Sequence, residues 1–219
     1  MRWIERLDEA PTGLAEPLVW VSRGLAADMM ADGAAHAARP AELAEAAGLG
    51  AERGARRLVR RGLLRALAAR VLAVHPDAVK IVRDPGGGLR IVGPEPLYVS
   101  HAGRGEWAAV ALARTPIGVD IEEAEPAPPL PLDLLHPLER ERLAALSDCD
   151  RAAAFARLWV VKEAFAKASG RGLDGVLAGS PARWLEAARA EIGGAPAELR
   201  TYEGVVAAAL TLPDRRARH

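Results

Sequence analysis

Apolar residues between residues 51 and 74 recur at helical spacing, and many of the polar positions between them are arginines. Six arginines fall within residues 53–65. The apolar stripe consists of Leu58, Leu63, Leu64, Leu67 and Leu72. This pattern predicts an amphipathic basic helix. Two more helices are predicted, around residues 137–146 and from residue 151 to about residue 169, where a glycine-containing segment ends the pattern.

Shorter apolar and β-branched runs predict strands. Residues 79–93 place two such runs around a Pro-Gly-rich turn at 84–88, so we expect a hairpin. Residues 96–123 contain three more strand-like runs, and residues 202–212 return to strand. The clustered prolines of residues 125–137 predict an extended loop. In the first fifty residues, short apolar pieces such as LVWVS precede Ala-rich text that favours helix.

The order of these elements favours an α+β fold. An Arg-rich helix followed by the strand-like GEWAAVALA is echoed by the helix at 151–169 followed by YEGVVAAALTL. A duplicated α+β unit would produce this order, although Ala-rich helices followed by strands are common in proteins.

Composition narrows the class of protein. The 219 residues are 50% hydrophobic, enough for one domain or two closely packed halves. Lys plus Arg and Asp plus Glu each total 29, so the net positive charge of generic nucleic-acid binders is missing. One cysteine, Cys149, excludes an internal disulfide framework and a multi-cysteine zinc site. We expect a cytoplasmic protein, because the first residues lack the apolar core of a signal peptide and no membrane-spanning run follows.

The segment PIGVDIE, residues 116–122, reads as a buried strand that carries two carboxylates. Alternation puts Gly118, Asp120 and Glu122 on one face, and Val119 and Ile121 on the other, toward a core. Carboxylates held side by side usually need a shared proton or a bound cation. A strand end that runs into solvent is the plainer alternative.

The segment WVVKEAFAK, residues 159–167, adds charged groups on a helix. Trp159, Glu163 and Lys167 follow at four-residue intervals along one stripe, and Lys162 flanks it. The bordering residues are apolar, so the helix should be mostly buried and its charges should need partners. A metal and a phosphate could be those partners, whereas a Glu–Lys surface pair is the alternative.

Together with VSHAG at residues 99–103, the segments GVDIE at 118–122 and WVVKEAFAK resemble the signature of the 4′-phosphopantetheinyl transferases, in the family's order. The resemblance extends from about residue 53 to residue 173, and residues 1–50 match only loosely. The chain length suits the larger, surfactin-synthetase-activating (Sfp) type better than the short trimeric holo-carrier-protein-synthase type.

The resemblance implies a pseudo-dimer of two similar α+β halves. Residues 1–115 would form the coenzyme A 3′-phosphate and adenine side, and residues 116–219 the metal-binding and catalytic half. The implied reaction is Mg²⁺-dependent transfer of the 4′-phosphopantetheine arm of coenzyme A to a serine of an apo acyl or peptidyl carrier protein, releasing adenosine 3′,5′-bisphosphate. We expect a monomer, because the two halves are fused, and neither a membrane nor a nucleic-acid partner.

Carried over by position, the resemblance implies that Asp120, Glu122 and Glu163 are the metal ligands. Lys167 would contact the reacting phosphate, and His101 would meet the coenzyme A phosphates. Carboxylate oxygens suit Mg²⁺, which prefers hard ligands, and nothing suggests zinc. Either Glu163 or a water on the metal could take the serine proton. The residues expected to act in catalysis are Glu163, Lys167 and His101.

The coenzyme A site draws on several segments. In that family, the helix before the hairpin supplies a basic residue to the 3′-phosphate, and Arg56 is the best positional match; a solvated basic face explains most of the other arginines. The family's Gly-Lys/Arg-Pro turn near the adenine is replaced here by PGGGLR, in which Gly87 matches the glycine and Arg90 is the available basic residue. The complete expected set is Arg56, Gly87, Ser100, His101, Lys162 and Lys167.

Two other functions start from the same residues. Residues 40–65 resemble a helix-turn-helix DNA-binding unit, although Gly54 stands where an aliphatic residue is usual and the balanced charge supplies no phosphate-binding field. The chain could also be a catalytically silent relative that binds carrier proteins, against which the retained carboxylates and Lys167 argue. The proline-rich residues 125–131 are either part of a carrier docking surface or a plain linker.

Overall fold

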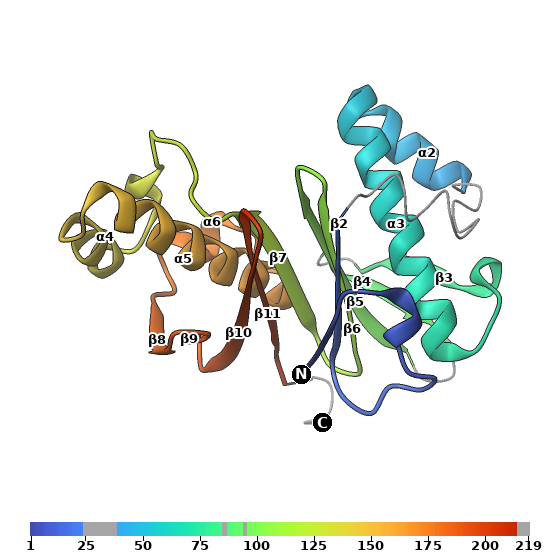
Figure 1. Ribbon diagram of the computed structural model, residues 1–219. Helices are drawn as coiled ribbons and strands as arrows, with labels where there is room; N and C mark the ends of the chain where they lie inside the picture. The colour runs from blue at the N-terminus through green and yellow to red at the C-terminus, as the bar shows by residue number, and fades with distance from the viewer. Residues whose placement is uncertain (24–38, 85–86, 94–95, 214–219) are drawn as a thin grey trace.

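Two sheets stand at the centre of the computed structural model, which describes residues 1–23, 39–84, 87–93 and 96–213 (Figure 1). The strands of the first sheet are, in spatial order, β1 (Arg2–Ile4), β2 (Leu18–Arg23), β6 (Trp107–Ala113), β5 (Leu97–Arg104), β4 (Leu89–Val92) and β3 (Lys80–Arg83). Those of the second are β7 (Ile117–Glu123), β11 (Val205–Thr211), β10 (Ala195–Tyr202), β9 (Arg189–Ile192) and β8 (Ala182–Glu186). β1 pairs with β2 in parallel, and the other paired strands are antiparallel.

The described helices are α2 (Pro40–Ala47), α3 (Ala51–Leu72), α4 (Pro137–Ala144), α5 (Asp148–Ser169) and α6 (Asp174–Leu177), with the short 3-10 turns η1 (Leu7–Glu9), η2 (Pro76–Ala78) and η3 (Leu132–Leu134). The predicted basic helix, the hairpin and the two later helices are confirmed. α5 begins three residues earlier than expected, because the Ser147 hydroxyl accepts a hydrogen bond from the Asp150 backbone N–H at 3.2 Å. Of the Ala-rich text expected to be helical, residues 24–38 lie outside the described residues.

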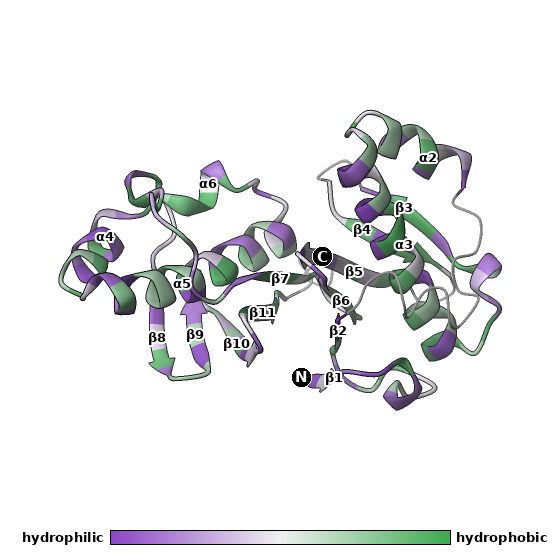
Figure 2. Ribbon diagram, turned by 45° about the horizontal axis from the view of Figure 1, so that its top comes forward, coloured by the Kyte–Doolittle hydropathy of each residue, from purple (hydrophilic) through white to green (hydrophobic). Residues whose placement is uncertain are grey.

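Three apolar layers hold the molecule together. α3 packs on one face of the first sheet and α5 on one face of the second, and the two sheets pack against each other through their remaining faces. Figure 2 shows the same order of layers from a second direction. The layer between the sheets consists of small or β-branched side chains: Val19, Val21, Ala102, Ala109, Ala111, Ala113, Ile117, Val119, Ile121, Val205, Ala207 and Ala209. The fold is therefore α+β, with one helix-covered sheet on each side, as predicted.

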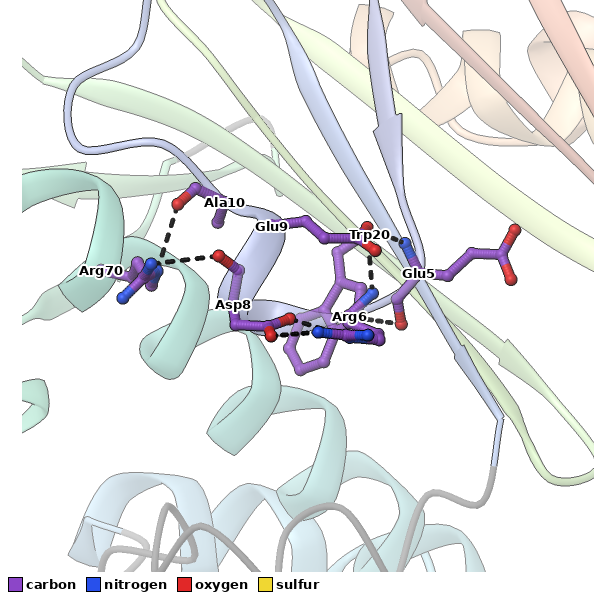
Figure 3. Close-up of polar contacts among 7 residues, drawn as sticks. All are labelled: Glu5, Arg6, Asp8, Glu9, Ala10, Trp20 and Arg70. Atoms are coloured by element: carbon purple, nitrogen blue, oxygen red, sulfur yellow. Dashed lines mark hydrogen bonds and ion pairs between the residues drawn. The ribbon is translucent and has the colours of Figure 1, made fainter.

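The start of the chain is fastened to the α3 side of the first sheet by hydrogen bonds (Figure 3) and by core residues that include Ile4 and Ala10. The Arg70 guanidinium donates to the carbonyl oxygens of Asp8 and Ala10, both at 3.1 Å. The indole N–H of Trp20 donates to the carbonyl oxygen of Glu5 at 3.0 Å. Backbone groups that no sheet pairs are thereby satisfied, and β1 is held beside β2.

The helix pair α2 and α3 occupies the segment that resembles a helix-turn-helix, but two of the arginines of α3 are buried against α2. Arg61 and Arg65 are 5% and 4% exposed. Arg65 pairs with Glu42 and Arg61 lies near Glu45, both on α2. A recognition helix needs its basic residues free to enter a groove, so this geometry disfavours the DNA-binding alternative. Among the described helices none is long and apolar enough to cross a membrane.

One close approach fixes α5 on the second sheet. A Cβ atom added to Gly118 on β7 would lie 1.8 Å from the carbonyl oxygen of Ala164 on α5. Helix and strand backbones are therefore in direct contact at this point, which only glycine permits.

We expect Gly118→Ala to lower the free energy of unfolding by about 2–3 kcal/mol, because α5 must move away from β7. At this chain length the melting temperature should fall by about 5–10 °C. Gly175→Ala in α6 is the control, since its added Cβ meets its nearest atom at an ordinary 4.0 Å. Equal melting temperatures for the two variants in differential scanning calorimetry would contradict the close-contact argument.

Candidate functional site

β7 and α5 bring three of the predicted residues together. The Lys167 ammonium lies 2.6 Å from Oδ1 of Asp120 and 3.8 Å from Oε2 of Glu163. It also donates to the carbonyl oxygen of Val119 at 3.3 Å. The face assignment made from the alternation is confirmed, because Val119 and Ile121 lie in the apolar layer between the sheets. Asp120 is 4% exposed, so its carboxylate is not a strand end running into solvent.

Glu122 lies one step further along the same face and has a different partner. Its carboxylate is 3.3 Å from Nε of Arg104, which also lies 3.0 Å from the carboxylate of Glu123. Arg104 comes from the end of β5, so this ion pair joins the first sheet to the second. Two cations from separate elements thus balance the acidic face of β7.

Burial and mutual repulsion perturb all three carboxylates. The pKa of Asp120 is raised by burial, although Lys167 opposes the shift. Burial and then the Asp120 charge raise the pKa of Glu122 to about 7. The pKa of Glu163 is raised by the same two causes. The three groups are therefore close enough to influence each other's ionisation, and the cluster favours an added positive charge.

The donor chemistry of these groups fits a magnesium ion. All three offer hard carboxylate oxygens, and Oδ2 of Asp120 is buried with no hydrogen-bond partner among the described residues. Within those same residues, however, no group of three His, Cys, Asp or Glu side chains is arranged to hold a metal ion. The ammonium of Lys167 and the guanidinium of Arg104 already balance these carboxylates, so a metal would have to share them.

Ser100 and His101 on β5 face opposite sides of the first sheet. The Ser100 hydroxyl is buried and accepts a hydrogen bond from the Val119 backbone N–H at 3.1 Å, which ties β5 to β7. Nδ1 of His101 is buried and has no partner among the described residues. Burial, and after it the charges of Arg60 and Arg61, hold the pKa of His101 well below its ordinary value. His101 is therefore neutral at pH 7.

Several arginines of α3 gather beside His101. The side chain of Arg60 packs over Gly103. A Cβ atom added to Gly103 would lie 2.8 Å from Nη1 of Arg60. Nε of Arg60 and both Nε and Nη1 of Arg61 are buried without partners among the described residues. Burial lowers the pKa of Arg60, and the charge of Arg57 lowers it further. Buried donors of one charge sign without partners are the chemistry of an anion site.

Arg56, predicted as the residue for the 3′-phosphate, lies at the edge of this group. Its guanidinium bonds the carboxylate of Glu52 at 2.8 Å and the carbonyl oxygen of Gly105 at 3.0 Å. Its side chain is 44% exposed. Arg57 and Arg60 were not singled out from the sequence, although spacings of three and four residues place positions 57, 60 and 61 on one helix face.

Gly87 lies in the β3–β4 turn with a φ of 83°, and residues 85–86 of the same turn are outside the described residues. Next to this turn, a cavity of about 320 Å³ is lined by Asp84, Gly88 and Tyr98 from the first sheet and by Lys167 and Gly170 at the end of α5. Arg90, the candidate basic residue, is neutralised because its guanidinium lies 2.5 Å from Asp84.

Lys162 does not belong to this site, and its assignment as a coenzyme A contact is corrected. Its side chain is 0% exposed, and its ammonium lies 2.9 Å from the Glu139 carboxylate. It also donates to the carbonyl oxygens of Leu177 at 2.7 Å and Ser180 at 2.8 Å. Glu139 in turn accepts from the Ala182 backbone N–H at 2.8 Å. The pair joins α4, α5 and the segment after α6, which is a structural role.

The sequence is similar to one family profile and to named relatives. Residues 116–200 match the sequence profile described as the 4′-phosphopantetheinyl transferase superfamily. A 4′-phosphopantetheinyl transferase of Bacillus subtilis is 29% identical over 148 residues, which cover 64% of this chain and 65% of the relative. A Synechocystis protein bearing the same transferase name is 34% identical over 128 residues, which cover 55% of this chain and 51% of the relative. The chain thus spans between about half and two thirds of these relatives' lengths.

We expect Glu122→Gln to stabilise the metal-free protein at pH 8 but not at pH 4. The folded protein keeps a proton on Glu122 up to about pH 7, whereas the unfolded chain releases it near pH 4.5. The free energy of unfolding of the wild type should therefore fall as pH rises through this window. Thermal unfolding in the presence of a chelator at both pH values measures the difference in melting temperature between the variant and the wild type. Each kcal/mol of unfolding free energy shifts the melting temperature by about 2–4 °C. An equal shift at both pH values would contradict the raised pKa.

We expect Lys162→Met to cost about 3–5 kcal/mol of stability, because the buried Glu139 carboxylate loses its cationic partner. The double variant Lys162→Met with Glu139→Gln should recover part of this loss. Urea unfolding measures the stability, and calorimetric titration with coenzyme A measures binding by the folded fraction. Weaker coenzyme A binding at unchanged stability would restore Lys162 to the binding residues.

Proposed function

We propose that this protein transfers the 4′-phosphopantetheine arm of coenzyme A to a serine of an apo carrier protein, a proposal supported by the match of residues 116–200 to the 4′-phosphopantetheinyl transferase superfamily. The observation that carries the proposal is the position of Lys167, whose ammonium lies between Asp120 and Glu163. An acidic cluster that includes its own lysine can bind a metal and a phosphate side by side.

Asp120, Glu122 and Glu163 would hold Mg²⁺. The ion would neutralise the pyrophosphate oxygens and so stabilise the charge that develops as the phosphorus–oxygen bond breaks. The unpartnered Oδ2 of Asp120 supports its role as a ligand. Lys167, which lines the cavity beside the β3–β4 turn, would offer its ammonium to a phosphate oxygen.

In the transfer, the serine Oγ of the carrier attacks the phosphorus next to the pantetheine arm. The bond from this phosphorus to the bridging oxygen breaks, and adenosine 3′,5′-bisphosphate leaves with the bond's electron pair. The serine proton needs an acceptor, and either Glu163 or a water would take it. Lys167 neutralises the leaving phosphate.

The rest of coenzyme A would extend over the first sheet. Its adenosine fits the cavity between the β3–β4 turn and the end of α5, next to Gly87. Its 3′-phosphate fits the buried arginines of α3 beside His101, with Arg56 at their edge and Ser100 holding β5 against β7. We further propose a division into halves at residues 1–115 and 116–219, and a monomer of the Sfp type. Acyl and peptidyl carriers are the proposed partners.

We expect wild-type protein mixed with coenzyme A, Mg²⁺ and an apo carrier protein to add one phosphopantetheine to the carrier, read by intact mass spectrometry. Asp120→Asn and Glu163→Gln should each lower the rate at least about 100-fold, because each removes a charged ligand. Glu141→Gln, an exposed carboxylate on α4, is the control and should keep the wild-type rate.

Carrier binding without any mass gain would instead identify a silent carrier-binding relative. Wild-type turnover in both Asp120→Asn and Glu163→Gln would contradict the ligand assignment. Omission of Mg²⁺ should abolish the transfer, and its persistence in excess chelator would refute the proposed metal.

A further inference from the structure

A carboxylate of the same chain lies on the arginine cluster. Oε2 of Glu45, near the end of α2, is 2.6 Å from Nη2 of Arg57, 3.8 Å from Nη2 of Arg61 and 3.9 Å from Nη2 of Arg83. Three guanidinium groups from α3 and β3 therefore converge on one carboxylate oxygen. Such convergence is how proteins bind a phosphate oxygen.

One carboxylate does not satisfy the cluster. Nε of Arg60, Nε and Nη1 of Arg61, and Nδ1 of His101 remain without partners among the described residues. Four arginines and a single glutamate leave an excess of positive charge in a partly buried place. A phosphate dianion, with more charge and more acceptor oxygens than a carboxylate, is the better partner for this cluster.

α2 does not depend on Glu45 for its position. Glu42 pairs with buried Arg65 and accepts the backbone N–H of Arg39 at 3.0 Å. The Arg39 guanidinium donates to the carbonyl oxygens of Asp77 and Val79, both at 2.8 Å. The side chain of Glu45 is 43% exposed, so its contacts can exchange with solvent and ions. Glu45 can therefore release the arginines while α2 stays in place.

We infer that Glu45 is an internal competitor for the 3′-phosphate of coenzyme A, whose carboxylate pairs with Arg57, Arg61 and Arg83 until the phosphate replaces it. This inference rests on the proposed function, in which the pyrophosphate of coenzyme A lies at Lys167 and its 3′-phosphate lies beside the first sheet. Glu45 weakens coenzyme A binding, since part of the binding energy is spent on breaking its ion pairs.

Calorimetric titration of Glu45→Gln with coenzyme A at low salt tests the competition. We expect a dissociation constant about two to five times lower than that of the wild type, the range for a half-exposed ion pair. Dephospho-coenzyme A should show no such gain, because it lacks the competing group. The gain should shrink at high salt as the pairs are screened. Glu191→Gln, which removes an equivalent carboxylate from the exposed pair with Arg183, is the control and should not change binding.

The outcomes separate this inference from the proposed function. A wild-type protein that binds no coenzyme A would overturn both. Wild-type binding with equal or weaker binding by Glu45→Gln would overturn only the competitor role, and an equal gain with dephospho-coenzyme A would overturn the 3′-phosphate assignment. Should Glu45→Gln fail to fold, Glu45→Asp shortens the side chain by one methylene and should show a smaller gain of the same sign.

Discussion

The direct contact between the backbones of β7 and α5 at Gly118 and Ala164 positions the charged groups of the candidate site. A helix usually lies on a sheet at a distance set by side chains, which would separate groups on the strand from groups on the helix. Here the separation is smaller, so an ammonium on α5 reaches a carboxylate on β7 at 2.6 Å. Both the packing of α5 on β7 and the ion pair between them thus depend on the absence of a side chain at Gly118.

This closeness has an electrostatic cost that the protein does not remove. Asp120, Glu122 and Glu163 all have raised pKa values because they are buried near one another. Stability alone would favour neutral residues here. The Mg²⁺ ion of the proposed function would relieve this repulsion, which lowers the stability of the ligand-free fold.

The sequence predicted those parts of the site that depend on local periodicity. Alternation along residues 117–123 correctly placed Asp120 and Glu122 opposite the apolar layer, and the four-residue spacing correctly joined Glu163 to Lys167. Lys162 was misplaced because the middle of α5 carries buried apolar residues on several faces, so periodicity cannot tell which face meets the sheet and which meets α4. Arg57 and Glu45 were missed because their pairing depends on how α2 crosses α3, a tertiary contact that no local pattern encodes.

Both charged clusters use partners from the chain itself: Lys167 beside Asp120, and Glu45 beside Arg57. The two clusters contain strong charges of both signs, and isolated charges would be unfavourable in a partly buried place. Internal partners reduce that cost while leaving some donors and one carboxylate oxygen unsatisfied. Ligand affinity is then the difference between two sets of ion pairs, so modest changes at the internal partners can adjust it without altering the groups that perform the reaction.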